Sequence, residues 1–272
     1  MQRLVTAAKD GQLVTGVRRR FRKPEAWYRW RLGLSYTPGT ELPSFSMQGD
    51  FSGRICTLVK QAFDEAVSNV SKLPNFVRDI DGMSGQKYRS FINNLVNLHP
   101  DARYLEIGSW GGSTAAAAMY GNSVDAVCID NWSQFGGPRD TFFANMESVR
   151  SPAMKLRVVE SDFRKVDFSS LGCFNLFLFD GLHEEADQYD GIIVARPALE
   201  KSFVLIVDDW NWRSVRIGTF RALIDAQYSV ICSIEIRTTS DNSHPRLSGK
   251  KSDWHNGYFI SALETRDRSL PQ

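Results

Sequence analysis

Three carboxylates are expected to meet at one edge of a predicted sheet. Asp180 ends the apolar run 174–179, and Asp208 and Asp209 end the apolar run 203–207. Runs of this kind that alternate with helical segments form neighbouring parallel strands, about 4.8 Å apart, whose carboxyl ends share one edge. The three acids would repel one another unless they are protonated or bridged by a cation. A hard divalent ion such as Mg²⁺, which binds a few carboxylates together with water and substrate oxygens, would remove this repulsion.

The adjacent positions of Asp208 and Asp209 limit this interpretation. Successive side chains of a strand point to opposite faces, so both can reach one ion only if the backbone has already left the strand conformation. Otherwise one of them caps a helix or binds a backbone amide. His183 follows Asp180 by three residues at the same edge, and an imidazole that titrates near neutrality suits proton transfer. The alternative for His183, a histidine in a surface loop, stays open.

A turn at 108–112 that contains three glycines follows the first predicted strand. Glycines at a strand-to-helix turn let the backbone approach a ligand closely, while the new helix offers unpaired N–H groups. The dinucleotide fingerprint does not fit, because Trp110 stands where its second glycine belongs, and this disfavours a nicotinamide-dependent dehydrogenase. The spacing is instead an acid, Glu106, then one residue, Gly108, three residues and Gly112.

Two further acids stand at the ends of the next predicted strands. Asp130 ends the run 124–129, and Asp162 follows the run 156–159. A carboxylate suits the binding of a diol, because it accepts hydrogen bonds from both hydroxyls. A single glycine turn or a single aspartate at a strand end has an ordinary structural explanation, such as a helix cap. The turn and both acids in chain order together predict a cofactor site.

The acid and glycine spacing resembles motif I of the class I S-adenosylmethionine-dependent methyltransferases, and the resemblance covers roughly residues 101–263. It implies that the glycine turn wraps the methionine part of the cofactor, that Asp130 holds the ribose hydroxyls, and that Asp162 meets the adenine amine. The segment 131–138 is expected to form a loop near the adenosine. The predicted cofactor-binding residues are Glu106, Gly108, Ser109, Trp110, Gly112, Ser113, Asp130, Asn131, Trp132, Asp162 and Asp180.

The segments 180–183 (Asp-Gly-Leu-His) and 208–210 (Asp-Asp-Trp) are similar to those of the macrocin O-methyltransferase (TylF-like) group, which modifies sugars in antibiotic biosynthesis. This resemblance implies that Asp180, Asp208 and Asp209 bind a divalent metal that chelates vicinal hydroxyls of the acceptor. His183 then becomes the candidate base and, with Asp180, a candidate catalytic residue.

We therefore expect an S-adenosylmethionine-dependent O-methyltransferase, assisted by Mg²⁺, that acts on a hydroxyl of a sugar-bearing or other polyhydroxylated small molecule. Two alternatives stay open. One is a metal-dependent hydroxylase or another non-methylating enzyme on the same fold. The other is a non-catalytic scaffold protein that retains the fold.

These residues require a scaffold of alternating strands and helices. The near-continuous apolar runs predict a parallel sheet covered on both faces, that is, a doubly wound Rossmann-like α/β fold. The predicted strands are 104–107, 124–129, 156–159, 174–179, 203–207, 229–236 and 258–263, and the predicted crossover helices are 113–120, 142–149 and 187–199. The last two strands are separated only by the polar loop 238–256 and are expected to pair as an antiparallel hairpin. His244 and His255 in that loop are expected to be solvated, and the alternative that either reaches a substrate stays open.

The chain divides into a basic irregular arm at 1–50, a helical extension or lid at 51–100, and the methyltransferase-like domain at 101–272. The extension is expected to contain helices at 55–73 and 86–98, with the loop 81–85 as a candidate lid.

The formal net charge of +2 conceals an asymmetry, because residues 1–35 carry nine basic and two acidic side chains while the remainder is net acidic. We expect the arm to contact another subunit of a homo-oligomer, with attachment to an anionic membrane as the alternative. No nucleic acid is expected as a partner, because the body is acidic and no nucleic-acid motif is present.

Length and composition exclude several classes of protein. With 272 residues and 42% hydrophobic side chains, the chain can bury a large core, which excludes disorder and a disulfide-stapled miniature fold. The four cysteines form no CxxC pair and are expected to be reduced thiols of a cytoplasmic protein. Lys9 and Asp10 interrupt any signal-peptide core, and no apolar stretch of about 18 residues predicts a membrane span.

Overall fold

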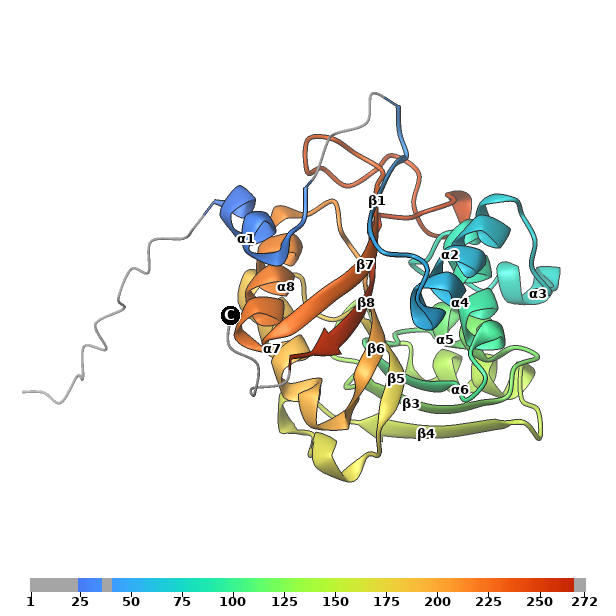
Figure 1. Ribbon diagram of the computed structural model, residues 1–272. Coiled ribbons are helices and arrows are strands. Elements are labelled where there is room, and N and C mark those ends of the chain that lie inside the picture. The colour runs from blue at the N-terminus through green and yellow to red at the C-terminus, as the bar shows by residue number, and fades with distance from the viewer. Residues whose placement is uncertain (1–23, 36–40, 267–272) are drawn as a thin grey trace, which may run out of the picture.

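An eight-stranded sheet forms the centre of the computed structural model, which describes residues 24–35 and 41–266 (Figure 1). The strands lie in the order β1-β7-β8-β6-β5-β2-β3-β4. They are β1 (Ser44–Gly49), β2 (Arg103–Ile107), β3 (Val124–Asp130), β4 (Met154–Glu160), β5 (Phe174–Phe179), β6 (Leu199–Val207), β7 (Tyr228–Arg237) and β8 (Tyr258–Thr265). Pairs among β2 to β6 are parallel, and pairs that involve β1, β7 or β8 are antiparallel.

This arrangement confirms the predicted fold class, a mostly parallel, doubly wound α/β sheet with a C-terminal antiparallel hairpin. Strand β8 lies between β6 and β7, so the hairpin is added to the edge of the parallel half. The α-helices are α1 (Glu25–Leu32), α2 (Arg54–Val67), α3 (Asn75–Arg78), α4 (Gln86–Leu98), α5 (Ser113–Met119), α6 (Arg139–Ser148), α7 (Glu185–Ala195) and α8 (Arg213–Asp225).

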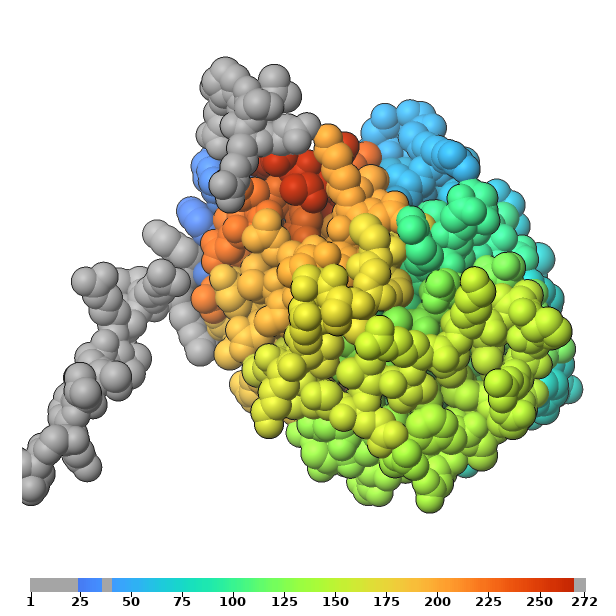
Figure 2. Space-filling view, turned by 90° about the horizontal axis from the view of Figure 1, so that it is seen from below, coloured from blue at the N-terminus to red at the C-terminus, as the bar shows by residue number. Residues whose placement is uncertain are grey.

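Helices cover both faces of the sheet. Along β5, Phe177 and Phe179 pack with α1, α7 and α8, whereas Leu176 and Leu178 pack with α2, α4, α5 and α6. Figure 1 shows the two groups of helices on opposite sides of the strands. Because alternate side chains of a strand point to opposite faces, burial on both faces requires an uninterrupted apolar run. Seen from below in Figure 2, the surface consists mostly of the green and yellow segments, which form the parallel half and its crossovers.

The bounds of several elements agree with the prediction and others differ. The strand 174–179 and the helix 86–98 have the predicted bounds. The helix predicted at 55–73 is wrong at its end, because α2 stops at Val67 and Asn69 adopts the left-handed conformation with φ 59°. Helix α8, between β6 and β7, was not among the predicted helices.

The prediction of an irregular segment at 1–50 is wrong for the part that the structure describes. Helix α1 packs against α8, and β1 pairs with β7 at the edge of the sheet. Phe45 of β1 makes edge contacts with the rings of Phe63 and Trp254, and these contacts help to hold the short strand against the sheet. The basic residues before Pro24 lie outside the described residues. Among the described helices, none is both long and apolar enough to cross a membrane.

Candidate active site

A cavity of about 410 Å³ opens at the carboxyl edge of the parallel strands. Its walls come from the segments that follow β2, β3, β4, β5 and β6 and from the loop between β7 and β8. This is the edge at which doubly wound sheets bind their ligands. The volume lies in the range of small-molecule and cofactor sites. The predicted glycine turn and the predicted acidic cluster therefore share one cavity.

The glycine turn is built so that only glycine fits at two of its positions. Gly108 has φ +90°, and a Cβ atom there would lie 1.8 Å from the carbonyl oxygen of Asp180. Gly112 has φ +80°, and its Cβ atom would lie 2.9 Å from the Phe142 ring. Both conformations are accessible to glycine without steric cost. The turn thus packs directly against the end of β5, which brings the predicted cofactor loop beside Asp180.

Asp130 fixes the shape of the turn. Its Oδ2 atom accepts hydrogen bonds from the backbone N–H groups of Ser109 and Trp110, both at 2.8 Å. Its Oδ1 atom accepts one from the N–H of Trp132 at 2.6 Å. Each carboxylate oxygen can accept more than one hydrogen bond, so the half-exposed Asp130 retains acceptor capacity on the cavity side.

The predicted cofactor-binding residues divide into two groups. Those that line the cavity are Gly108, Ser109, Trp110, Ser113, Asp130, Asn131, Asp162 and Asp180. Three others, Glu106, Gly112 and Trp132, lie behind it. Glu106 is fully buried and accepts a hydrogen bond from the Tyr104 hydroxyl, and burial raises its pKa to about 7. Trp132 donates from Nε1 to the carbonyl oxygen of Trp110 at 2.9 Å, so it supports the turn from outside.

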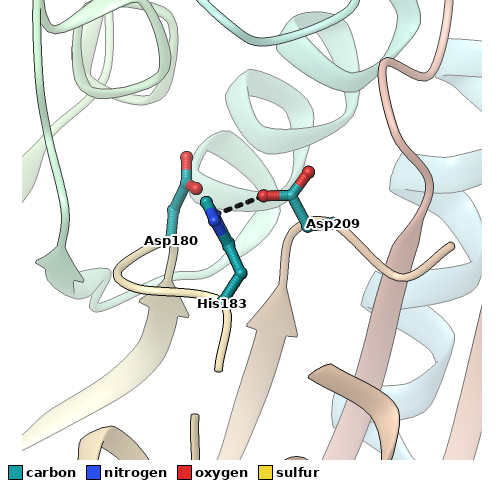
Figure 3. Close-up of side chains that lie close together, drawn as sticks. All are labelled: Asp180, His183 and Asp209. Carbon is teal, nitrogen blue, oxygen red and sulfur yellow. Dashed lines mark ion pairs between the residues drawn. The ribbon is translucent and has the colours of Figure 1, made fainter. Parts of the chain in front are cut away.

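Asp180, His183 and Asp209 come together from the ends of β5 and β6 (Figure 3). Each offers a ligand atom, and these atoms all lie within 4.8 Å of one another. The Nε2 atom of His183 lies 2.5 Å from Oδ2 of Asp209. Two acids and one imidazole thus form a compact polar cluster that faces the cavity.

The pKa values in this cluster reflect burial and mutual charge. Burial and the charge of Asp209 raise the pKa of Asp180 to about 8. Burial would raise the pKa of Asp209, but the hydrogen bond and charge of His183 lower it. Burial likewise opposes the charge of His183, yet its hydrogen bond to Asp209 and the two nearby carboxylates raise its pKa. His183 and Asp209 therefore stabilise each other through a hydrogen bond, while burial and the charge of Asp209 disfavour the charged form of Asp180.

Asp208 faces away from this cavity. It is 4% exposed, is not among the lining residues, and accepts the N–H of Asp209 at 2.6 Å. Its carboxyl hydrogen-bonds with that of Asp180, and burial and the charge of Asp180 raise its pKa well above the usual range. The backbone does leave the strand conformation here, because β6 ends at Val207 and Asp209 has φ 56°. The predicted ligand trio is thus divided, with Asp208 placed behind Asp180 and Asp209.

The donor set at the cavity suits a divalent cation. Asp180 and Asp209 supply carboxylate oxygens, which Mg²⁺ and Mn²⁺ prefer, and His183 adds a nitrogen that suits transition metals. Burial and the charge of Asp209 raise the pKa of Asp180, and a bound cation would oppose both effects by stabilising the carboxylate. Asp208 and Asp209 form a second group with His255, in which all three residues are buried.

His255 and Asn256 lie at the site, although neither was among the predicted site residues. His255 was expected to be solvated, but it is only 5% exposed and lines the cavity, and burial lowers its pKa to about 4. Asn256 is fully buried and donates from Nδ2 to Oδ1 of Asp209 at 2.6 Å. A signal did exist, because an antiparallel strand begins at the edge where its parallel neighbours end. Residues just before 258–263 therefore had to lie beside the acids.

Aromatic and loop residues complete the walls. Trp212 lines the cavity and makes an edge contact with His183 at 4.8 Å between ring centroids. His244 and Met83 also line it, Met83 from the loop predicted as a lid. Trp210 and Trp254 instead belong to the hydrophobic core.

The fold of the chain is similar to those of several solved structures. No family model and no curated protein sequence matches the chain. Among solved structures it resembles the O-methyltransferase TomG from Streptomyces achromogenes, which is involved in tomaymycin synthesis and was solved with SAM. The TM-score is 0.47 at 15% identity, over 77% of this chain and 90% of that chain. It also resembles the O-methyltransferase from Bacillus cereus in complex with SAH. There the TM-score is 0.46 at 13% identity, over 76% of this chain and 91% of that chain.

A third similar structure is TrmN from Thermus thermophilus. The TM-score is 0.44 at 14% identity, and 65% of this chain is covered. The chain spans about half the length of TrmN, 48% of that chain.

Proposed function

We propose that this protein is an S-adenosylmethionine-dependent O-methyltransferase, assisted by a divalent cation, that acts on a hydroxyl of a sugar-bearing or other polyhydroxylated small molecule. One observation carries the proposal. The cavity that contains the glycine turn, Asp130 and Asp162 also contains Asp180, His183 and Asp209. A methyl donor at the first group and an acceptor at the second would meet inside one enclosure.

The cofactor half of the cavity offers the groups that an adenosylated amino acid requires. Gly108 and Ser113 bring backbone and hydroxyl groups to the cavity at the start of α5. Asp130 can accept hydrogen bonds from ribose hydroxyls, and Asp162, which caps the following turn through the N–H of Arg164, lines the wall beyond it. The glycine turn, Asp130 and Asp162 follow the neighbouring strands β2, β3 and β4, in the order of methionine, ribose and adenine in the proposed cofactor.

The acceptor half offers a base held in place by a carboxylate. Methyl transfer is an in-line displacement at a sulfonium carbon, so the protein must align the acceptor oxygen and remove its proton. The Nε2 atom of His183 is engaged by Asp209, which leaves Nδ1 to accept the proton. The Asp209 carboxylate fixes the ring and stabilises the imidazolium that forms, as in other histidine and aspartate pairs.

A cation would be held by the carboxylates of Asp180 and Asp209, with a ring nitrogen of His183 within 4.8 Å of both. When bound, it would lower the pKa of the acceptor hydroxyl and fix the position of its oxygen. Asp208 would support this site from behind through its hydrogen bond with Asp180.

Calorimetry with S-adenosylmethionine and S-adenosylhomocysteine tests the cofactor half. We expect both to bind, and Asp130→Asn to weaken binding by roughly 10- to 100-fold, because hydrogen bonds to a charged group contribute about 1.5 to 3 kcal/mol. Asp125→Asn is the matched control, because Asp125 is an exposed aspartate of the same strand. If neither compound binds, the proposed cofactor is excluded. The mass of the product then identifies the reaction, since methylation adds CH₂ and hydroxylation adds oxygen.

Removal of metal tests the cation. We expect a chelator to abolish most of the methyl transfer and Mg²⁺ to restore it, because a cation that lowers the hydroxyl pKa acts directly on the reacting oxygen. Asp180→Asn should be inactive in methyl transfer with or without Mg²⁺, while calorimetry still detects S-adenosylhomocysteine. An activity that is indifferent to the chelator would contradict the role of a cation and leave the cofactor proposal standing.

A further inference from the structure

His255 occupies an unusual position in the acceptor half of the cavity. It lies in the loop before β8, is 5% exposed and has φ 39°. Its ring lies on the other side of Asp209 from His183, because its Nε2 atom is 4.0 Å from Oδ1 of Asp209 whereas His183 contacts Oδ2. Two imidazoles therefore flank one carboxylate.

The protonation of the His255 ring is fixed by the backbone. The N–H of Gly249 donates a hydrogen bond to Nδ1 of His255 at 2.9 Å. A backbone amide can only donate, so Nδ1 must offer its lone pair and cannot carry a proton. This excludes both the Nδ1–H tautomer and the doubly protonated ring. The remaining form has its proton on Nε2, the atom on the side of Asp209.

That Nε2–H group has no hydrogen-bond acceptor among the residues that the structure describes. A separation of 4.0 Å is too long for a hydrogen bond to Asp209. The nearest carboxylate oxygen already accepts the Nδ2–H group of Asn256 at 2.6 Å. Because His255 lines the cavity, its free donor is available to a bound molecule.

The loop that carries His255 is preorganised. Ser252 donates its hydroxyl to the carbonyl oxygen of Gly249 at 2.9 Å and accepts the N–H of His255 at 3.0 Å. Gly249 has φ +56°, and a Cβ atom there would lie 2.6 Å from the carbonyl oxygen of Gly82. The amide that sets the His255 tautomer is therefore held by the 249–255 loop and by the loop that leads into α4. A donor fixed in this way binds an acceptor with little loss of conformational entropy.

We propose that His255 is a specificity-determining residue. Its Nε2–H donates a hydrogen bond to a second oxygen of the substrate, which lies next to the reacting hydroxyl. The inference rests on the proposed function in one respect, that a hydroxyl reacts at His183. With His183 as the base on one side of Asp209 and His255 as a donor on the other, the site selects molecules that carry two neighbouring oxygens. A vicinal diol or a hydroxyl next to an ether oxygen meets this requirement, and a lone alcohol does not.

The tautomer is tested by long-range ¹H–¹⁵N correlation of protein labelled with ¹⁵N-histidine. We expect His255 to be protonated at Nε2 alone at neutral pH. His244 provides an internal contrast, because its Nδ1 lies 3.0 Å from the carbonyl oxygen of Pro245 and must donate. His255→Gln and His244→Gln assign the two spin systems. A His255 ring that is protonated at Nδ1, alone or together with Nε2, would overturn the inference.

The specificity is tested with two probes of matched size, trans-1,2-cyclohexanediol and cyclohexanol. Both are titrated into the protein with S-adenosylhomocysteine and a chelator, so that chelation by a metal cannot favour the diol. We expect the diol to bind about fivefold tighter or more, the effect of one added hydrogen bond, and to shift the His255 Nε2 signal. In His255→Phe the two affinities should become equal.

Equal affinities in the unsubstituted protein, or a preference for the diol that survives in His255→Phe, would overturn the inference. The comparison in the unsubstituted protein needs no variant, so a misfolded His255→Phe does not affect it. Calorimetry distinguishes a failure of the proposed function from a failure of the inference on His255. If S-adenosylhomocysteine does not bind, that function falls, while the tautomer and the diol preference still report on His255.

Discussion

Replacing His183 with glutamine is expected to lower the kcat of methyl transfer by about 100- to 10,000-fold, the usual contribution of a positioned general base. The Nε2 atom of His183 lies 2.5 Å from Asp209, and in the proposed reaction this contact fixes the ring while Nδ1 takes the proton of the acceptor. Glutamine has no group that can accept a proton near neutral pH. The measurement is the rate of S-adenosylhomocysteine formation with an acceptor identified by product mass.

Two controls test whether the loss of kcat comes instead from a disturbed structure. His99→Gln makes the same exchange at the amino ends of the strands, away from the cavity, and is expected to leave kcat unchanged. The affinity of His183→Gln for S-adenosylhomocysteine should stay within about twofold of the original, because the glycine turn and Asp130 are not altered. A kcat within tenfold of the original would show that His183 is not the base.

The positions of the glycine turn and of the acids at one edge of the sheet could be predicted because each is marked by its own local sequence. Asp180 directly follows one apolar run, and Asp208 and Asp209 follow another. Parallel topology alone brings the ends of such runs to one edge of the sheet. Gly108 could be predicted for the same reason, since a turn between a strand and a helix at this edge must approach its neighbour closely. The sequence does not determine whether the side chain of each aspartate points into the cavity or away from it. Asp208 and Asp209 are adjacent, and only the φ of 56° at Asp209 separates their directions.

The missed elements depend on partners that are distant in the sequence. Helix α1 has only eight residues, and it is held through Arg29, whose guanidinium binds Glu235, a residue 206 positions away. Strand β1 exists because β7 offers it an edge. His255 and Asn256 enter the site because β8 lies between β6 and β7. Local periodicity carries no information on such pairings, so α1 and β1 could not be predicted from the pattern of one chain. The only signal for His255 and Asn256 was the expected antiparallel hairpin that begins after them.

The same distant pairing gives the second large expected effect. Glu235 of β7 is fully buried and accepts two hydrogen bonds from Arg29, at 2.6 and 2.8 Å, and one from Nε1 of Trp210 at 2.8 Å. Arg29 also binds Glu25, which in turn accepts two hydrogen bonds from Arg216. This network joins α1, α8 and β7 and reaches Trp210, the residue after Asp209.

Glu235→Gln is expected to lower the free energy of unfolding by about 3 to 5 kcal/mol, because it leaves the buried guanidinium of Arg29 without its bidentate partner. Urea denaturation measures the loss. The double variant Arg29→Met with Glu235→Gln should be less destabilised than Glu235→Gln alone, since methionine removes the positive charge that has lost its buried carboxylate partner and keeps the apolar packing. An exposed pair provides the control. Lys60→Met breaks the ion pair with Asp64 on the surface of α2 and should cost less than about 1 kcal/mol.

The double variant decides what holds the N-terminal helix in place. If it is as unstable as Glu235→Gln, the loss comes from the missing hydrogen bonds and not from a buried charge. If Glu235→Gln itself costs no more than Lys60→Met, helix α1 is held by apolar contacts such as that of Tyr28 with the cluster under α8. The expected order, with Glu235→Gln lowest and the double variant between it and the original, would mean that the charges of Arg29 and Glu235 chiefly specify where α1 docks. Their net contribution to stability would then be small, as is usual for buried ion pairs.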